Sequence, residues 1–347
     1  MTVAPEDRTG VLCAGTLLVD YGKIIDAYPS RDGLATIGQI SRSTGGAALN
    51  MAMDLRRLGA MFDVGLVGCV ADDDDGAHIL EACTQAGVDV RSVSVEPGAT
   101  TAFTDVMVER EGGRRTFFTY MGTNGLFELS AEGLDGSRAR ILHAGNLGVH
   151  PLMDHPGVDG HSGWSRLLAA AQARGMHTNL ELASLAPDRL AALAGPCLPH
   201  LDSIIVNELE GSALTGTSVS APGADDAVDW VAMEDLARGL IERGVSTIAV
   251  VHFPAGCVAA TSDGRGWRQG SVQLAPSEVV STTGAGDAFA AGVILGLHEG
   301  RSVDACLRLG AAAAAACIKD SHTSNGIVSA ADCLATAEAV GYRKARS

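Results

Sequence analysis

Residues 281–292, STTGAGDAFAAG, place the carboxylate of Asp287 directly after Gly284, Ala285 and Gly286, at the start of a predicted helix. Small residues in such a turn leave backbone N–H groups accessible, and the positive end of the helix dipole lies at the same place. The turn therefore predicts an anion site that needs no lysine. A carboxylate beside that site suits a reaction in which Asp287 accepts the proton of a hydroxyl group attacking a phosphoryl group.

The same turn also has a purely structural interpretation, because aspartate is common near helix starts. Two other nucleotide-binding patterns are excluded. The chain contains no G-x-x-x-x-G-K-[ST] loop, and Phe289 stands where a dinucleotide fingerprint needs glycine. The function of the turn therefore depends on what surrounds it.

Strand-like and helix-like segments alternate along most of the chain, which predicts an α/β fold with a doubly wound, mostly parallel sheet. We expect one domain spanning residues 1–347. The predicted strands are 11–15, 62–70, 139–145, 177–182, 201–207, 246–252 and 257–262. The predicted helices are 47–59, 76–87, 164–175, a short one near Pro187, 233–244 and three more before the C-terminus.

Two regions interrupt this alternation. Residues 16–44 contain short β-prone runs and turn residues but no helical pattern, and residues 101–120 form a predicted hairpin around a glycine turn. Both regions are expected to leave the main sheet and to pair as a small β-sheet lid over the site.

Composition excludes several classes of partner. The 347 residues carry a formal net charge of −16, which disfavours nucleic acid and anionic membrane surfaces. None of the 8 cysteines forms a C-x-x-C pair, which favours reduced core thiols. The N-terminus has no signal-peptide pattern, and no apolar run is long enough to span a bilayer. We expect a cytoplasmic protein.

Three motifs together resemble the ribokinase-like (PfkB) carbohydrate kinases. Residues 282–292, TTGAGDAFAAG, are similar to the C-terminal signature of that family. Residues 45–60, GGAALNMAMDLRRLGA, resemble its N-terminal signature, and residues 207–210, NELE, resemble its Asn-x-x-Glu element. The motifs occur in the order and spacing of the family, so the resemblance covers nearly the whole chain.

The resemblance implies a role for each matching residue around the phosphoryl group. Asp287 matches the general base, and the amides of residues 284–286 match the anion hole. Asn207 and Glu210 match the pair that organises Mg²⁺ and the phosphates of ATP. Magnesium prefers oxygen ligands and retains water molecules, which suits an Asn/Glu pair better than the scattered cysteines.

On the acceptor side, Gly45, Gly46 and Asn50 match the substrate-binding signature. The glycines allow a sugar to approach the backbone, and the Asn50 amide offers a donor and an acceptor to hydroxyl groups. Asp20 stands where the family often has a sugar-binding aspartate. Glu181 ends a predicted strand at the edge of the sheet where ligands bind in wound α/β folds, so it is also a candidate site residue.

The predicted lid adds Asp105 and Arg115 as candidate substrate-binding residues, because period-two alternation turns some side chains of a strand towards the site. A solvated strand face is the alternative for each. Phe117 and Phe118 are expected in a small core of the lid or in a lid-to-lid contact, and we expect a homodimer formed through the lid.

Other polar residues have simpler explanations. The run Asp72–Asp75 predicts helix capping rather than a metal site. His143 and His252 end strands and are expected in core or rim positions.

Two segments depart from the family. Ser281 replaces an aspartate that often precedes the glycine turn, so the sequence leaves the monovalent-cation dependence open. The nucleotide segment 251–256, VHFPAG, keeps only Gly256 of the usual glycine pattern. The alanine-rich stretch 310–317 is expected to form one wall of the adenine pocket, although core packing explains it equally well.

The resemblance implies an ATP- and Mg²⁺-dependent kinase that phosphorylates a hydroxyl group of a sugar or sugar-like molecule. A nucleoside kinase of the same family is an alternative, since Phe103, Phe127 and Tyr120 offer aromatic walls for a base. A non-catalytic sugar or nucleotide sensor is a further alternative, and a dehydrogenase is disfavoured by the missing fingerprint.

Overall fold

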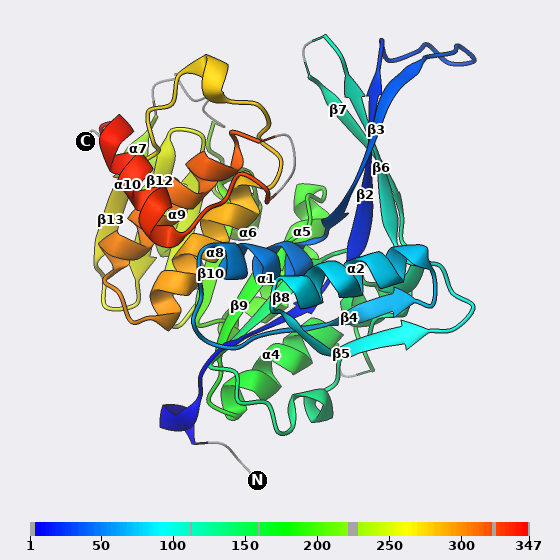
Figure 1. The fold of residues 1–347 in the computed structure, drawn as a ribbon. Helices are drawn as coiled ribbons and strands as arrows, with labels where there is room; N and C mark the ends of the chain where they lie inside the picture. The colour runs from blue at the N-terminus through cyan, green and yellow to red at the C-terminus, as the bar shows by residue number, and fades with distance from the viewer. Residues whose placement is uncertain (1–3, 112, 159, 221–227, 321–323, 346–347) are drawn as a thin grey trace.

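The computed structural model describes residues 4–111, 113–158, 160–220, 228–320 and 324–345. In these ranges the largest element is a 9-stranded sheet with the order β13-β12-β11-β10-β9-β8-β1-β4-β5. Neighbouring strands from β11 to β5 are parallel, and β12 and β13 add antiparallel pairs at one edge, as Figure 1 shows. The predicted mostly parallel sheet is confirmed. Its strands are β1 (Val11–Gly15), β4 (Val64–Ala71), β5 (Asp89–Glu96), β8 (Ile141–Leu147), β9 (His177–Leu182), β10 (Ser203–Asn207), β11 (Ile248–Phe253), β12 (Gly256–Thr261) and β13 (Gly266–Gly270).

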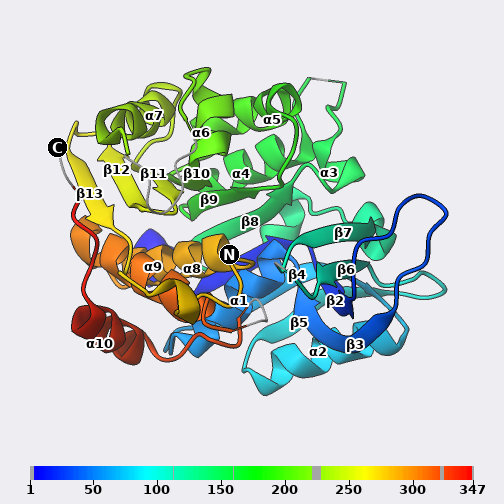
Figure 2. The ribbon, with the colours of Figure 1, turned by 90° about the horizontal axis from the view of Figure 1, so that it is seen from above.

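Helices cover both faces of this sheet (Figure 2). One apolar core lies under α1 (Ala47–Arg57), α2 (Asp74–Gln85), α8 (Ala285–His298), α9 (Val303–Cys317) and α10 (Ala330–Val340). The other lies under α3 (Pro151–Asp154), α4 (Gly163–Ala173), α5 (Pro187–Ala194), α6 (Glu208–Thr215) and α7 (Trp230–Glu242). The doubly wound arrangement is therefore confirmed. Short 3₁₀ turns are η1 (Pro5–Asp7), η2 (Gly122–Leu126), η3 (Ala131–Leu134), η4 (Gly195–His200) and η5 (Pro276–Glu278).

The two interrupting regions form a separate sheet that projects from the body of the molecule (Figure 1). Its order is β3-β2-β6-β7, with strands β2 (Leu18–Ile25), β3 (Ile37–Gly45), β6 (Phe103–Glu109) and β7 (Arg115–Tyr120). The outer pairs are antiparallel, and the central pair β2–β6 is parallel. Parallel pairing follows from topology, because both segments leave the main sheet in the same direction. The turn between β6 and β7 includes residue 112, which lies outside the described residues.

Some elements escape prediction from the sequence. β5 has an exposed, charged strand pattern, and β13 (GWRQG) has glycine at both ends and no apolar alternation. Helix α6 (ELEGSALT) is short and polar in its first turn. Each therefore lacks the apolar periodicity that marks the longer elements. The predicted helices over 47–59 and 76–87 begin or end within two residues of α1 and α2.

The acidic run at residues 72–75 caps α2 and also holds the base of the second sheet. Asp73 accepts a hydrogen bond from the Gly76 amide at 2.8 Å, which confirms the predicted helix cap. Asp75 accepts a hydrogen bond from the Tyr21 hydroxyl at 2.6 Å and forms an ion pair with Arg42. Capping and anchoring thus account for two of the four carboxylates without a metal.

The cysteines match the expectation of reduced core thiols. All eight cysteines are unpaired and buried. Among the described residues, no helix combines the length and the apolar character that crossing a bilayer requires.

Candidate active site

The turn before α8 has the geometry expected of an anion hole. Gly284 adopts φ 81° and precedes the helix without a side-chain cap, a conformation that favours glycine. The Ala285 amide donates to the Thr282 carbonyl at 3.3 Å. The amides of Gly284 and Gly286 have no hydrogen-bond acceptor among the described residues. These two N–H groups are available to an anion at the positive end of the helix.

Asp287 lies next to two other predicted site residues. The Asn50 side-chain amide, from the first turns of α1, donates to Asp287 Oδ2 at 2.7 Å. The Glu181 carboxyl, from the end of β9, is in hydrogen-bonding contact with the Asp287 carboxyl. Burial, and next the charge of Glu181, raise the pKa of Asp287 well above its ordinary value. The fold therefore brings together the amide of Asn50 and the carboxyl groups of Glu181 and Asp287, which come from three distant segments of the chain.

Gly45 and Gly46 lie where α1 and the second sheet approach each other closely. A Cβ on Gly45 would lie 2.2 Å from Asp20 Oδ2, and one on Gly46 would lie 2.4 Å from the Thr16 carbonyl oxygen. Gly46 also has φ 101°. A larger residue is therefore excluded at Gly46 by backbone, whereas at Gly45 it would displace the Asp20 side chain, which lies beside the N-terminus of α1.

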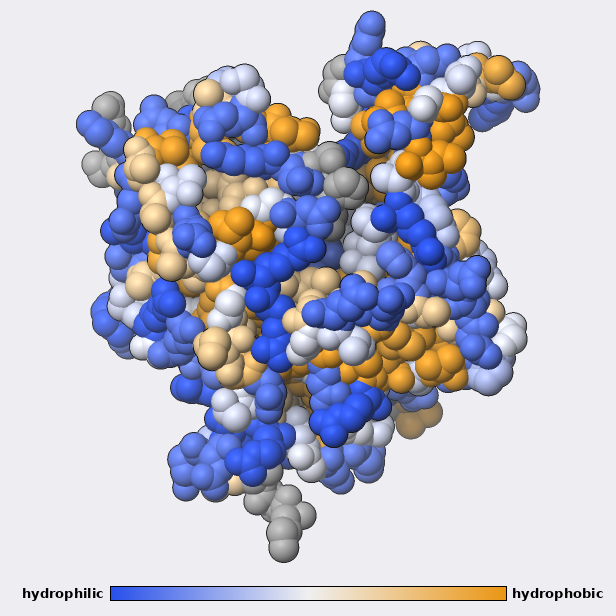
Figure 3. Space-filling view, in the orientation of Figure 1, coloured by the Kyte–Doolittle hydropathy of each residue, from blue (hydrophilic) through white to orange (hydrophobic). Residues whose placement is uncertain are grey.

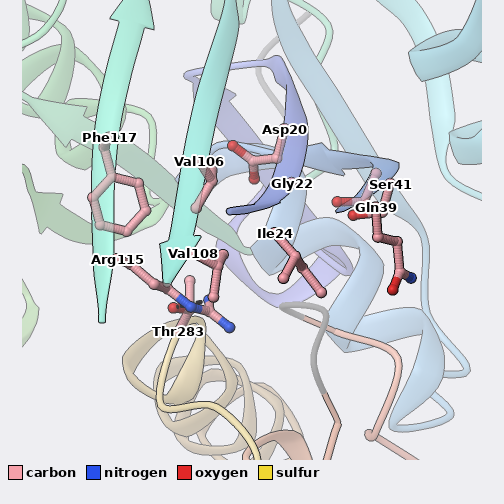
Figure 4. A pocket seen from close by; sticks show the side chains of 11 residues that line it. Asp20, Gly22, Ile24, Gln39, Ser41, Val106, Val108, Arg115, Phe117 and Thr283 are labelled. Atoms are coloured by element: carbon pink, nitrogen blue, oxygen red, sulfur yellow. Dashed lines mark hydrogen bonds between the residues drawn. The ribbon is translucent and has the colours of Figure 1, made fainter. Parts of the chain in front are cut away.

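A cavity of about 160 Å³ lies between the second sheet and the turn before α8 (Figure 4). Asp20 and Arg115 enter it from the sheet, and Thr283 enters it from the turn. The Arg115 guanidinium donates a hydrogen bond to the Thr283 hydroxyl. Burial, and then the charge of Asp287, raise the pKa of Asp20 to about 6, while Arg115 opposes this rise. The other residues that line the cavity are Gly22, Ile24, Gln39, Ser41, Ser43, Val106, Val108 and Phe117.

Asp105 does not share this cavity. The cavity-lining residues of β6 are Val106 and Val108, and successive residues of a strand alternate between its faces. Asp105 therefore lies on the opposite face, where it forms an ion pair with Lys23.

The aromatic residues considered for a nucleoside base are also absent from the lining. Phe103 packs against Tyr120 with ring centroids 5.4 Å apart. Phe127 is buried near Trp164 in the core of the large sheet. Phe117 is instead the aromatic residue of the described lining.

A larger pocket of about 470 Å³ also borders the turn before α8, through Thr282, Ala285 and Gly286. Gly286 and Asn207 line one end of it, and the predicted Gly256 lines it near the β11–β12 connection. Its apolar wall includes Val272, Leu274, Ile318 and the α9 residues Ala311, Ala314 and Ala315. The alanine-rich stretch thus lines this pocket, and its role as a wall of an adenine site stays a prediction.

Asn207 and Glu210 form a capping box at the start of α6. Asn207 Oδ1 accepts hydrogen bonds from the Leu209 and Glu210 amides at 3.0 and 2.9 Å, and Glu210 Oε2 accepts one from the Asn207 amide at 3.0 Å. Burial raises the pKa of Glu210 to about 7. No cluster of three or more acidic, histidine or cysteine residues suited to a metal occurs among the described residues. The donor set suits a magnesium ion held mainly by phosphates and water, with Glu210 as its acidic neighbour.

Three residues near the turn were not assigned to the site from the sequence. Thr283 contacts Arg115, and His252 lines the large pocket. His143, within β8, lies 3.2 Å from Glu181 through Nε2 and Oε2. The sequence placed both histidines near strand ends, and this was their only signal; His252 does lie near the end of β11, whereas β8 continues four residues past His143. Thr283 had no signal beyond its place in the motif.

Comparison with known proteins decides the family. The family model described as pfkB family carbohydrate kinase matches residues 9–330. The chain belongs to this family. It is therefore an ATP-dependent carbohydrate kinase, in a family whose curated members include sugar and nucleoside kinases.

The pfkB relatives span different acceptors. An ATP-dependent ribose-1-phosphate kinase of Halopiger xanaduensis is 30% identical over 82% of this chain and 83% of its own. A nucleoside kinase of Methanothermobacter thermautotrophicus is 24% identical over 93% of each chain. A solved Arabidopsis thaliana ribokinase, complexed with ribose and ATP, superposes with a TM-score of 0.77 at 22% identity and covers 95% of this chain and 99% of its own. The last comparison supports the fold alone.

Proposed function

We propose that this kinase transfers the γ-phosphoryl group of ATP to a hydroxyl group of a sugar or sugar-like molecule, with Asp287 as the general base. One observation carries the proposal. The turn before α8 borders both spaces, since Thr283 lines the small cavity and Ala285 and Gly286 line the large apolar pocket, and Asp287 follows it in contact with Asn50. An acceptor on one side and a nucleotide on the other would meet at this turn.

Each residue group then has one task. Asp287 accepts the hydroxyl proton, and the amides of Gly284 and Gly286 receive the charge that develops on the transferred phosphoryl group. A magnesium ion near Glu210 and Asn207 would neutralise the charge of the phosphates. With Asn207 Oδ1 engaged by two backbone amides, the Asn207 side chain contributes its NH₂ group to a phosphate oxygen rather than a metal ligand.

The acceptor cavity favours a polar ligand. Asp20 accepts hydrogen bonds from acceptor hydroxyls, while Arg115 and the second sheet, which acts as a lid, cover the ligand. The guanidinium beside the cavity also suits an acceptor with an anionic group, such as the ribose 1-phosphate named for one relative. A nucleoside is the second candidate, because one relative is named a nucleoside kinase and Phe117 offers a ring face.

A panel of acceptors tests the proposal. The purified protein with ATP and Mg²⁺ is supplied with neutral sugars, sugar acids, ribose 1-phosphate and nucleosides, and ADP release and the phosphorylated product are measured. We expect turnover with at least one sugar or sugar derivative. Turnover with nucleosides alone would replace the sugar assignment by the second candidate, and no turnover with any class would reject the proposal.

We also propose a cytoplasmic homodimer formed through the lid. The aromatic side chains of β7 support it, because Phe117, Phe118 and Tyr120 remain 54%, 51% and 49% exposed. Figure 3 shows hydrophobic residues gathered on the projecting sheet. Light scattering of the wild type and of Phe118→Ser tests this. A wild-type monomer, or a dimer that Phe118→Ser leaves intact, contradicts the proposed interface.

A further inference from the structure

The residues that follow α10 form a short strap at the rim of the larger pocket. After Val340 the chain runs beside β13 (Figure 2). An antiparallel bridge between Val272 and Tyr342 and two backbone hydrogen bonds of 2.8 and 2.9 Å join residues 341–343 to residues 271–273. Residues 341–343, here called the C-terminal strap, are therefore held in place by backbone pairing.

Gly270, the last residue of β13, permits this pairing. A Cβ at Gly270 would lie 1.9 Å from the Arg343 carbonyl oxygen, so a larger residue would displace the backbone of the strap. The Arg343 amide donates to the Ser271 carbonyl at 2.8 Å, directly beyond that glycine. The local sequence thus fixes where the Arg343 side chain begins.

The C-terminal strap also packs on α9. The Arg308 guanidinium lies over the Tyr342 ring, 5.2 Å from its centroid. Ala311 and Ala315 follow Arg308 by three and seven residues, so they lie on the same side of the helix. Both alanines line the larger pocket, which places the strap beside the alanine wall of that pocket.

Arg343 brings a positive charge to the larger pocket. Within the lining that the structure describes, it is the one arginine or lysine. The whole chain has a formal net charge of −16, and Glu208 adds a carboxyl group to the same lining. An anionic nucleotide that enters this pocket would therefore meet Arg343 in acidic surroundings.

The order of the strands places Arg343 away from the phosphate end of the pocket. Asn207, which ends β10, and Gly286 mark that end. The edge of the sheet continues from β10 through β11 and β12 to β13, and Ser271 follows β13. Neighbouring strands lie about 4.8 Å apart, so three spacings separate Asn207 from Ser271 by roughly 14 Å. At this distance Arg343 lies where the base of a nucleotide extends, rather than its phosphates.

We propose that Arg343 binds the nucleobase of ATP by stacking its guanidinium group on the ring. This inference rests on the proposed function, which puts the nucleotide in the larger pocket. A guanidinium group is planar and weakly hydrated, and it stacks on aromatic faces. Val272 and Leu274, which line the pocket next to the strap, suit the same apolar ring. The strap thus serves the base, while the turn before α8 serves the phosphates.

Arg343→Ala tests this role through nucleotide binding, measured by titration calorimetry. We expect the Kd values of ADP and ATP to rise by the same factor, about five- to tenfold, at low and at high salt. The acceptor KM and kcat should stay within about twofold of the wild type. Arg343→Tyr restores a planar stacking surface without a charge, so it should bind ADP more tightly than Arg343→Ala.

Lys344→Ala is the matched control. It removes one positive charge from the next residue, which is exposed and does not line the pocket, and should keep the wild-type Kd values. A wild-type affinity for ADP in Arg343→Ala overturns the proposal. So does a loss that is larger for ATP than for ADP, grows at low salt and does not recover in Arg343→Tyr, because it would assign Arg343 to the phosphates. Equal losses in Arg343→Ala and Lys344→Ala would assign the effect to net charge and overturn it as well.

Ala314→Leu distinguishes failure of this inference from failure of the proposed function. Ala314 lines the larger pocket from α9. If ADP binds the wild type and Ala314→Leu equally well, the nucleotide lies outside this pocket and the proposed placement fails. If Ala314→Leu weakens ADP binding but Arg343→Ala does not, the role of Arg343 alone is rejected.

Discussion

The two spaces on either side of the 284–286 turn are built from different side chains. The acceptor cavity, about 160 Å³, has Asp20 and Arg115 projecting into it from a sheet that extends away from the body. The nucleotide pocket, about 470 Å³, is bounded on its apolar side by alanine, valine and leucine residues of the rigid core. If the two spaces hold the acceptor and the nucleotide as proposed, the smaller one would discriminate by charge and hydrogen bonds and the larger one by shape.

This difference suggests how one fold serves many acceptors. The residues that line the larger pocket include parts of α8 and α9, which pack in the core of the main sheet. Those that line the smaller cavity alternate along β2, β3, β6 and β7, away from the two cores of the main sheet. The turn before α8 is shared by both spaces, so changes there should affect the reaction rather than the binding of one ligand.

Asp287→Asn tests the shared turn and should have the largest effect. An asparagine keeps the hydrogen-bonding shape but cannot accept a proton, so kcat should fall by about 10²–10⁴. ATP affinity, measured by titration calorimetry, should change little. Asp235→Asn on the exposed surface of α7 is the matched control and should keep wild-type kcat. Near-normal turnover of Asp287→Asn would exclude Asp287 as the base.

Arg115→Gln tests the charge of the acceptor cavity. Loss of a charged hydrogen bond costs about 1.5–3 kcal/mol, which corresponds to roughly 10- to 100-fold in kcat/KM for the acceptor. The KM for ATP should stay within about threefold. Arg115→Lys keeps the charge but loses the planar guanidinium geometry, so its kcat/KM for the acceptor should lie between those of the wild type and Arg115→Gln. If Arg115→Gln raised the KM for ATP instead, Arg115 would serve the nucleotide and the division between the two spaces would be wrong.

Ala314→Leu tests shape in the nucleotide pocket. Ala314 lines the pocket from α9, and a leucine there would fill part of the space for the nucleotide. Overfilling of this kind costs about 1–3 kcal/mol, so the KM for ATP should rise by about tenfold while the acceptor KM stays near that of the wild type. Ala316→Leu lies on the same helix outside the described lining and controls for destabilisation of α9. Equal effects of both variants would show that α9 packing, not the pocket, is responsible.

The same two spaces explain what the sequence revealed and what it did not. The glycine turn, Asp287 and the Asn50 helix could be predicted because each sits in a local motif with its own backbone requirement. The face on which a lid residue lies could not, since residues 16–44 and 101–120 gave no register. Asp105 and Arg115 were therefore indistinguishable, yet the pairing of β6 with β7 turns Arg115 into the cavity and Asp105 away from it. His143 and Thr283 were missed because their roles depend on neighbours distant in sequence.

The pH dependence of acceptor binding tests whether Asp20 acts as a carboxylate. Burial, and then the charge of Asp287, raise the pKa of Asp20 to about 6, so its ionised form accumulates as the pH rises from 5 to 7. Acceptor hydroxyls donate to the ionised form, and the acceptor KM should therefore fall by about fivefold over this interval. The KM for ATP should not follow the same curve, because Asp20 does not line the nucleotide pocket. Asp20→Asn should weaken acceptor binding at pH 7 and remove the slope. A slope that persists in Asp20→Asn would assign the titration to another group, such as Glu181, and would place charge recognition deeper in the site than the lid.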